Sequence, residues 1–155
     1  MKYVLNSENE TQELVEKFTK EISLPLIVGL QGDLGVGKTV FVRSIIKSYN
    51  KNERVKSPTF SLVEEYQYDK IDITHIDLYR IRKNEKYYLN ISDYQNEKSL
   101  ILIEWINNDK KLMNYSDIII NIAILDSKET RIIEFSANSK NGEKIIQNIE
   151  NEFKK

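Results

Sequence analysis

The fold of this chain is decided by the stretch Gly32-Asp33-Leu34-Gly35-Val36-Gly37-Lys38-Thr39. It fits the pattern G-x-x-x-x-G-K-[ST], a glycine-rich loop whose backbone N–H groups surround the phosphates of a nucleotide. The apolar residues 26–30 come just before it and predict a buried strand, and residues 40–46 follow with the apolar face of a helix. Strand, loop and helix in this order distinguish a phosphate-binding loop from a chance glycine-rich turn.

Each residue type in the loop has a chemical reason. Glycine adopts backbone angles that a side chain would forbid, so the loop can turn its N–H groups inward around an anion. The following helix adds the partial positive charge of its N-terminus. The Lys38 ammonium can reach the β- and γ-phosphates, and the Thr39 hydroxyl can ligate Mg²⁺. The sequence therefore predicts that ATP or a related nucleotide binds here together with Mg²⁺.

The composition is typical of a globular protein without a strongly charged surface. The chain has 155 residues, of which 40% are hydrophobic and 30% charged, which predicts a single domain, 1–155, with its own core. With 23 basic and 24 acidic residues, the net charge of −1 creates no strong field that favours nucleic acid or a membrane. We therefore expect any RNA partner to be reached through another protein. Because cysteine is absent, disulfides and thiolate metal sites are excluded.

The sequence predicts neither a signal peptide nor a membrane span. Residues 1–7 turn polar too soon for a signal peptide, and no apolar run approaches the length that crosses a membrane. A cytoplasmic location is therefore expected.

Apolar runs and turn residues along the chain predict an α/β fold of the P-loop NTPase class, with a mostly parallel central sheet, antiparallel edge strands and flanking helices. Residues 100–103 are apolar throughout, as a central parallel strand should be, and residues 60–66 and 71–77 predict an antiparallel hairpin at the sheet edge. Ser7 and Glu10 predict a capping box at the start of the first helix. The other predicted elements are an edge strand at 2–5, helices ending near 20 and 49, a short helix with loops at 80–93, strands 118–125 and 131–136 in a hairpin around Asp126-Ser127-Lys128, and a final helix at 141–153.

Two carboxylates end hydrophobic strands beside the loop. Asp77 follows the strand 73–76, and Glu104 follows the strand 100–103. Ligands of open α/β sheets bind outside the carboxyl ends of the strands, so both side chains are expected near the phosphates. One carboxylate can hold the metal or its waters, and the other can position or activate a water molecule. The alternative is that one of them caps the next element.

Three further features lie in or near these motifs. Ser57-Pro58-Thr59 is a rigid, hydroxyl-bearing turn where switch loops of this fold lie, so Thr59 can approach the metal or the γ-phosphate, although such a tripeptide is more often only a turn. His75 lies in the middle of a strand and by itself predicts a packed core histidine. Trp105 is either a core residue or a lid beside the nucleotide.

Missing motifs narrow the class of nucleotide-binding protein. The chain lacks the guanine-reading motif Asn-Lys-x-Asp, and Asp77-Leu78-Tyr79-Arg80 lacks the glycine that GTPases carry in Asp-x-x-Gly. Two alternatives to an ATPase stay open. A small kinase of a metabolite needs a lid and an acceptor pocket, for which the sequence offers no obvious candidate. A non-catalytic module that senses nucleotide and switches a partner would bind ATP without hydrolysing it.

Four motifs occur in a fixed order. They are the loop 32–39, then Val55-Lys56-Ser57-Pro58-Thr59-Phe60-Ser61-Leu62-Val63, then His75-Ile76-Asp77-Leu78-Tyr79-Arg80, and finally Ile103-Glu104-Trp105. Together they resemble the TsaE family, formerly called YjeE, the bacterial ATPase of tRNA threonylcarbamoyladenosine biosynthesis. The resemblance extends from about residue 5 to residue 105, and the last fifty residues match only in length and pattern.

The resemblance implies a Mg²⁺-dependent ATPase that is slow alone and depends on partners. It implies that Lys38 binds phosphate, that Thr39 and Glu104 ligate Mg²⁺, and that Asp77 is the essential carboxylate of a catalytic set with Lys38 and Glu104. It also makes Ser57, Pro58 and Thr59 the switch loop. The implied ATP-binding residues are Ser7 and Thr11 on the adenine side, Trp105 near the nucleotide, and Asp33, Leu34, Gly35, Val36, Gly37, Lys38, Thr39 and Val40 around the loop.

The family works with TsaB and TsaD, of which TsaD transfers the threonylcarbamoyl group to adenosine 37 of tRNA. The resemblance therefore implies that this chain supports repeated turnover of the complex and meets tRNA only through it. Two positions depart from the family pattern. Val40 replaces a second threonine of many members, so metal ligation rests on Thr39, and Asn90 replaces a glycine at a turn where asparagine tolerates left-handed angles.

Overall fold

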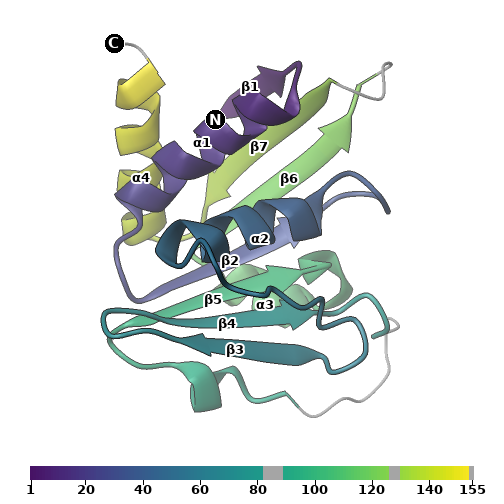
Figure 1. Ribbon diagram of the computed structural model, residues 1–155, viewed down its shortest axis with the longest axis vertical. Helices are drawn as coiled ribbons and strands as arrows, with labels where there is room; N and C mark the ends of the chain where they lie inside the picture. Colours follow the sequence, from purple (N-terminus) through teal and green to yellow (C-terminus); the bar gives the residue numbers. More distant parts are fainter. Residues whose placement is uncertain (82–88, 126–129, 154–155) are drawn as a thin grey trace.

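A computed structural model describes residues 1–81, 89–125 and 130–153 of the chain. These residues form a seven-stranded sheet with helical elements on both faces (Figure 1). The elements, with η for a short 3₁₀ helix, are β1 (Lys2–Leu5), α1 (Glu8–Glu21), β2 (Leu26–Gln31), α2 (Lys38–Tyr49), β3 (Val63–Gln67), β4 (Asp72–Asp77), η1 (Ile91–Tyr94), β5 (Ser99–Glu104), η2 (Ile106–Asn108), α3 (Lys110–Tyr115), β6 (Ile118–Ile124), β7 (Arg131–Ala137) and α4 (Lys140–Phe153). Within the described ranges, no helix combines the length and the apolar character that a membrane crossing requires.

The sheet has the strand order β1-β7-β6-β2-β5-β4-β3. Its four middle strands run parallel, and β2, which leads into the phosphate loop, lies between β5 and β6. At one edge β3 pairs antiparallel with β4, and at the other side β7 pairs antiparallel with both β6 and β1. The predicted α/β fold with a mostly parallel centre and antiparallel edge strands is confirmed, as is the central place of β5.

Both faces of the central strands are buried, which explains why their sequences are apolar throughout. In β5, Leu100 and Leu102 belong to the large core beneath α1, α2 and α4, whereas Ile101 and Ile103 belong to a smaller core on the other face with Ile106 of η2. Figure 1 shows α1, α2 and α4 over one face of the sheet and α3 behind it. Because side chains alternate along a strand, this pattern also decides which residues at the strand ends face α2.

Gly29 of β2 allows η2 to lie close against the sheet. A Cβ atom at this position would lie 2.7 Å from Cγ1 of Ile106 and 2.9 Å from Cδ1 of Ile119, which is too close for either contact. Since only Trp105 separates η2 from β5, this packing holds the chain that follows β5 against β2, the strand that leads into the phosphate loop.

The first helix begins at the predicted cap. The Glu10 N–H donates to Oγ of Ser7 at 3.2 Å, which satisfies one of the free donors of the first turn. The Glu10 carboxylate accepts from the N–H of Asn6 at 2.9 Å. The capping box therefore forms with its return hydrogen bond one residue earlier than in the standard motif.

The hairpin strand predicted for residues 60–66 begins only at Val63, so this prediction is wrong for its first three residues. The Leu62 N–H donates to the carbonyl oxygen of Pro58 at 2.7 Å, and Leu62 has a φ of 71°, in the left-handed region. The chain therefore turns where the sequence predicts extension, and Phe60 is 83% exposed. Tertiary contacts of Thr59, described below, hold this turn against the local preference for a strand.

Two short elements were not predicted, η2 and α3, because neither is long enough to show a helical period. The strand β6 has a second role that was not predicted: it forms the expected hairpin with β7 and also pairs parallel with β2. In the segment 80–93, the described helical turn is η1, and residues 82–88 lie outside the described residues, as does the predicted turn Asp126-Ser127-Lys128.

Asn90 does not adopt the left-handed angles that its place in the family pattern predicts. Its φ is −100°, and its side chain accepts from the N–H of Ser92 at 3.3 Å as the cap of η1. The side-chain cap thus replaces the glycine turn at this position.

Candidate functional site

The phosphate loop, residues 32–37, joins the carboxyl end of β2 to the N-terminus of α2. Gly32 has a φ of 142°, and a Cβ atom there would collide with the carbonyl oxygen of Ile122. Gly37, with a φ of 110°, is the N-cap of α2 and offers no side-chain acceptor. The first N–H groups of α2 are thus left for another acceptor, which is the usual basis of anion binding at a helix N-terminus.

Lys38 lies in the first turn of α2, with 4% of its surface exposed. Its ammonium donates to the carbonyl oxygens of Gly32 at 2.7 Å and Asp33 at 2.8 Å, and lies 3.7 Å from the centre of the Trp105 ring. Burial lowers the pKa of this ammonium from its ordinary value, and the nearby Glu104 carboxylate opposes the shift. Its present acceptors are neutral carbonyl oxygens, so a charged acceptor such as a phosphate would bind this ammonium more strongly.

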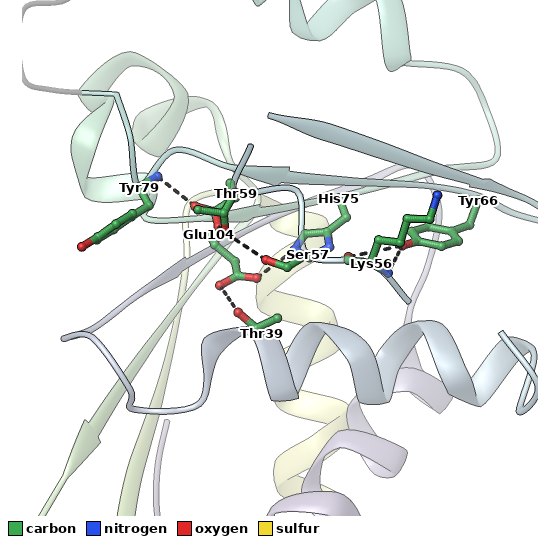
Figure 2. Close-up of polar contacts among 9 residues, drawn as sticks. Thr39, Lys56, Ser57, Thr59, Tyr66, His75, Tyr79 and Glu104 are labelled. Atoms are coloured by element: carbon green, nitrogen blue, oxygen red, sulfur yellow. Dashed lines mark hydrogen bonds and ion pairs between the residues drawn. The ribbon is translucent and has the colours of Figure 1, made fainter. Parts of the chain in front are cut away.

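The Glu104 carboxylate at the end of β5 is held through both of its oxygens (Figure 2). Oγ1 of Thr39, on α2, donates to Oε2 at 2.8 Å, and Nε2 of His75, on β4, lies 2.8 Å from Oε1. Glu104 and His75 are both buried, with 1% and 0% of their surfaces exposed. His75 is thus a buried histidine, as predicted, but it is also the polar partner of a predicted metal ligand.

Asp77 ends β4 directly beside Glu104 in the strand register. Its Oδ2 accepts from the Thr59 hydroxyl at 2.9 Å, and the Ser57 hydroxyl lies 2.9 Å from that of Thr59. Its Oδ1 accepts from the N–H of Tyr79 at 2.8 Å. One oxygen therefore caps the turn after β4, as the alternative interpretation predicts, and the other connects β4 to the segment 57–59.

Lys38, Thr39, Thr59, Asp77 and Glu104 line one cavity of about 320 Å³, whereas Ser57 and His75 are not among its lining residues. Its walls come from the phosphate loop, α2, Thr59 and the ends of β4 and β5. The lining residues are Leu34, Gly35, Gly37, Lys38, Thr39, Val40, Thr59, Asp77, Tyr79, Glu104 and Trp105. The structure thus brings together candidate residues from four separate stretches of the sequence.

The two candidate residues of the adenine side do not reach this cavity. Thr11 lines a smaller hollow of about 120 Å³ on the other side of the loop, together with Val36, Gly37 and Val40. Gly37 and Val40 line both hollows, so the two spaces are neighbours. Ser7 is among the lining residues of neither hollow, and its hydroxyl caps α1.

Trp105 turns the chain from β5 into η2, with a φ of 58° that is unusual for a residue with a side chain. Its ring lies 5.0 Å, centre to centre, from the ring of Tyr79 and also contacts the Lys38 ammonium. Trp105 therefore forms part of the cavity wall, although it also contacts the smaller core.

Two residues at this site were missed by sequence reasoning. Tyr79 lines the cavity and its backbone N–H donates to the Asp77 carboxylate, and His75 pairs with Glu104. A period of two along β4 could have placed His75 on the same face as Asp77. No comparable signal exists for Tyr79, because its position depends on the turn that follows the strand.

The available ligands suit Mg²⁺ better than a metal held wholly by protein. In the described part of the chain, no three His, Cys, Asp or Glu side chains gather into a ready-made metal centre. Mg²⁺ usually takes only one or two carboxylates and completes its shell with waters and substrate phosphates. The Thr39 hydroxyl and the Glu104 carboxylate, already in contact beside the loop, are the groups that could supply the protein ligands.

Known proteins are similar to this sequence over most of its length. The family described as "Threonylcarbamoyl adenosine biosynthesis protein TsaE" matches residues 5–133, which extends into β7 and beyond the last of the four motifs. The protein named tRNA threonylcarbamoyladenosine biosynthesis protein TsaE of Rickettsia typhi is 41% identical over 82% of this chain and 89% of its own length. The proteins of the same name from Haemophilus influenzae and Aquifex aeolicus are 39% and 37% identical, over 81% and 83% of this chain and 79% and 91% of their own.

A solved structure, that of the Bacillus protein YdiB, has the same architecture. It superposes with a TM-score of 0.78 and covers 99% of this chain and 95% of its own, at 22% sequence identity. At this identity the likeness concerns the fold alone. With the strand order and the loop geometry, it confirms the predicted P-loop NTPase fold.

Proposed function

This chain belongs to the TsaE family of tRNA threonylcarbamoyladenosine biosynthesis, and from that membership we propose that it is the ATP-hydrolysing subunit of the modification. In this proposal, ATP and Mg²⁺ bind in the cavity between α2, β4 and β5. Hydrolysis supports repeated turnover of a TsaB–TsaD complex that modifies adenosine 37 of tRNA, and this chain meets tRNA only through that complex. The proposal is carried by one observation: residues of the phosphate loop, Thr59, Asp77 and Glu104 line the same cavity.

Binding begins with the loop and Lys38. We expect the phosphates to lie against the N–H groups at the start of α2, where the helix dipole favours negative charge. The Lys38 ammonium then exchanges the carbonyl oxygens of Gly32 and Asp33 for the oxygens of the β- and γ-phosphates. Because this ammonium lies on the ring of Trp105, the only tryptophan, the exchange should change tryptophan fluorescence.

Thr39 and Glu104 are the residues that would hold Mg²⁺. A bound Mg²⁺ would neutralise charge that develops on the phosphates during transfer. The two side chains already point at each other, since Oγ1 of Thr39 donates to Oε2 of Glu104. Both sit on regular elements, α2 and β5, so their positions are set by the core rather than by a loop.

We assign to Asp77 the role of positioning the water molecule that attacks the γ-phosphate. A carboxylate within reach of the γ-phosphate can orient water and accept its proton, which is worth about 10²–10⁴-fold in rate for general bases. Asp77 also accepts a hydrogen bond from Thr59, so a shift of this carboxylate would move the segment 57–59. ATP and its hydrolysis can therefore change the shape of this segment, as the γ-phosphate does for switch loops of GTPases.

The test is ATP hydrolysis by the purified protein, measured alone and with purified TsaB and TsaD. We expect slow phosphate release alone and faster release with the pair. Recovery of the pair on immobilised protein, compared in ATP, ADP and no nucleotide, should depend on the nucleotide. A protein that binds ATP but hydrolyses none, with or without the pair, would instead be a sensor, and one that phosphorylates an added metabolite would be a kinase.

A further inference from the structure

His75 is wholly buried, and among the described residues its side chain is hydrogen-bonded to Glu104 alone. Nε2 lies 2.8 Å from Oε1 of Glu104, whereas Nδ1 has no hydrogen-bond partner among the described residues. A buried polar ring with a single partner costs more than an apolar side chain of similar size, unless that partner needs it. The site described above uses Glu104 but gives His75 no role.

The direction of this hydrogen bond follows from its partners. A carboxylate only accepts, so Nε2 carries the proton and donates. The ring therefore acts on Glu104 through Nε2, since Nδ1 has no hydrogen-bond partner among the described residues. His75 therefore gives Glu104 one fixed donor from inside the core.

Glu104 is consequently clamped by two donors on two different oxygens. His75 binds Oε1 from β4, on the buried side, and Thr39 binds Oε2 from α2, on the side of the phosphate loop. The last torsion of a glutamate side chain is broad and has no strong preference of its own. Without the His75 contact, nothing among the described contacts would fix the rotation of this carboxylate about that bond except the Thr39 hydroxyl.

We propose that His75 is a positioning residue that holds the Glu104 carboxylate so that Oε2 and the Thr39 hydroxyl face the phosphate loop together as ligands of Mg²⁺. Hydrogen-bond partners of metal-ligating carboxylates are known to matter for metal affinity, typically by about 10–100-fold. This inference rests on the proposed function, because it requires that nucleotide binds here with Mg²⁺. A purely structural role for His75 would affect stability but would not act on the metal specifically.

The matched variants are His75→Gln and His75→Asn. The glutamine amide nitrogen reaches about as far as Nε2 and can keep the donor, whereas the asparagine amide ends near the position of Nδ1 and stops short of Glu104. Both replace an aromatic ring by a polar amide, and they differ in one methylene and in whether the amide reaches Glu104, so thermal unfolding of both variants measures the difference in packing.

The measurement is the Mg²⁺ concentration that gives half of the metal-dependent gain in ADP affinity, followed by calorimetry with and without Mg²⁺. We expect His75→Asn to raise this concentration about 10-fold, with unchanged affinity for ADP in the absence of Mg²⁺. His75→Gln should stay close to wild type. Thermal unfolding of each variant shows whether it is folded; if His75→Asn is not, then His75→Gln carries the test, and a large rise in its Mg²⁺ requirement overturns the inference.

Other outcomes also overturn it. Equal Mg²⁺ requirements in His75→Asn and wild type mean that the clamp is not needed. Equal losses in both variants, or a loss of ADP affinity that appears without Mg²⁺ as well, mean that His75 acts only through packing. If the wild-type protein itself binds ADP without any effect of Mg²⁺, the proposed metal site fails, which is a different result from a failure of His75.

Discussion

Glu104 and Asp77 stand opposite each other in the strand register, yet they are held in different ways. Glu104 is bound by His75 and Thr39, which lie on β4 and α2, so its partners belong to the packed frame. Asp77 is bound by Thr59, from the segment between α2 and β3, and by a backbone N–H of the turn after β4. We call the environment of Glu104 rigid, because helix and strand residues hold it, and that of Asp77 adjustable, because a loop segment and a turn hold it.

The difference indicates how one cavity can bind Mg²⁺ at one carboxylate and change its shape with the γ-phosphate at the other. A metal ligand benefits from fixed geometry, because each fixed oxygen is ready before the metal arrives. A group that positions water benefits from a connection to a segment that changes with the γ-phosphate. We therefore expect substitutions at Glu104 to change Mg²⁺-dependent binding and stability, and substitutions at Asp77 to change turnover.

The largest effect is expected for Lys38→Ala, which removes the ammonium that we expect to bind the β- and γ-phosphates. Loss of a charge-assisted contact to phosphate should weaken MgATP binding by about 100-fold, measured by calorimetry. The core should remain folded, because the contacts of the Lys38 ammonium with described residues are those with the loop carbonyls and the Trp105 ring. Lys47→Ala is the matched control, since Lys47 is an exposed lysine of the same helix outside this cavity. Equal ATP affinity in Lys38→Ala and wild type would contradict the assignment of the loop.

The next effect breaks the rigid half of the comparison. Glu104→Ala leaves the Nε2–H of His75 buried without an acceptor, which should lower the free energy of unfolding by about 1–3 kcal/mol in chemical denaturation. Asp77→Ala should lower the free energy of unfolding by less. The two groups that lose their acceptor, the Thr59 hydroxyl and the N–H of the exposed Tyr79, can form hydrogen bonds with water instead. A larger stability loss for Asp77→Ala than for Glu104→Ala would reverse the comparison.

The smallest effect concerns the adjustable half. Thr59→Val keeps the shape of the side chain but removes the hydroxyl that binds Asp77, so the segment 59–62 should exchange its amide hydrogens faster. The free energy of unfolding should fall by only about 0.5–1.5 kcal/mol. Ser61→Ala is the control, because it removes a hydroxyl in the same segment that binds Glu64 instead. Unchanged exchange in Thr59→Val, or the same change in Ser61→Ala, would show that the Asp77 contact does not hold this segment.

Much of the central sheet and of the phosphate loop could be predicted, because the sequence patterns that indicate them are local. The loop pattern, the apolar strand 100–103 and the carboxylates that follow two strands are each visible over a few residues. Because the carboxyl ends of parallel strands lie together, Asp77 and Glu104 are then expected at one edge of the sheet. These features depend on backbone geometry that every parallel sheet shares.

What could not be predicted depends on contacts between distant segments. Leu62 turns left-handed at residues that favour a strand, because Thr59 binds Asp77 and the Asp77 N–H binds the Leu62 carbonyl at 3.1 Å. The close fit of Ile106 on Gly29 likewise joins residues far apart in the chain. No local pattern encodes such contacts, and for the same reason the partner of His75 was not foreseen.

The most direct test of the division between the two carboxylates is Asp77→Asn, with MgATP affinity and ATP hydrolysis measured on the same preparation in the presence of TsaB and TsaD. The amide keeps the size of the carboxylate but cannot take a proton from water, so hydrolysis should fall by about 100-fold or more. MgATP affinity should stay close to wild type, in contrast to Glu104→Ala, because Asp77 is not expected to hold the metal. Hydrolysis at the wild-type rate, or a loss of MgATP affinity as large as that of Glu104→Ala, would contradict this division.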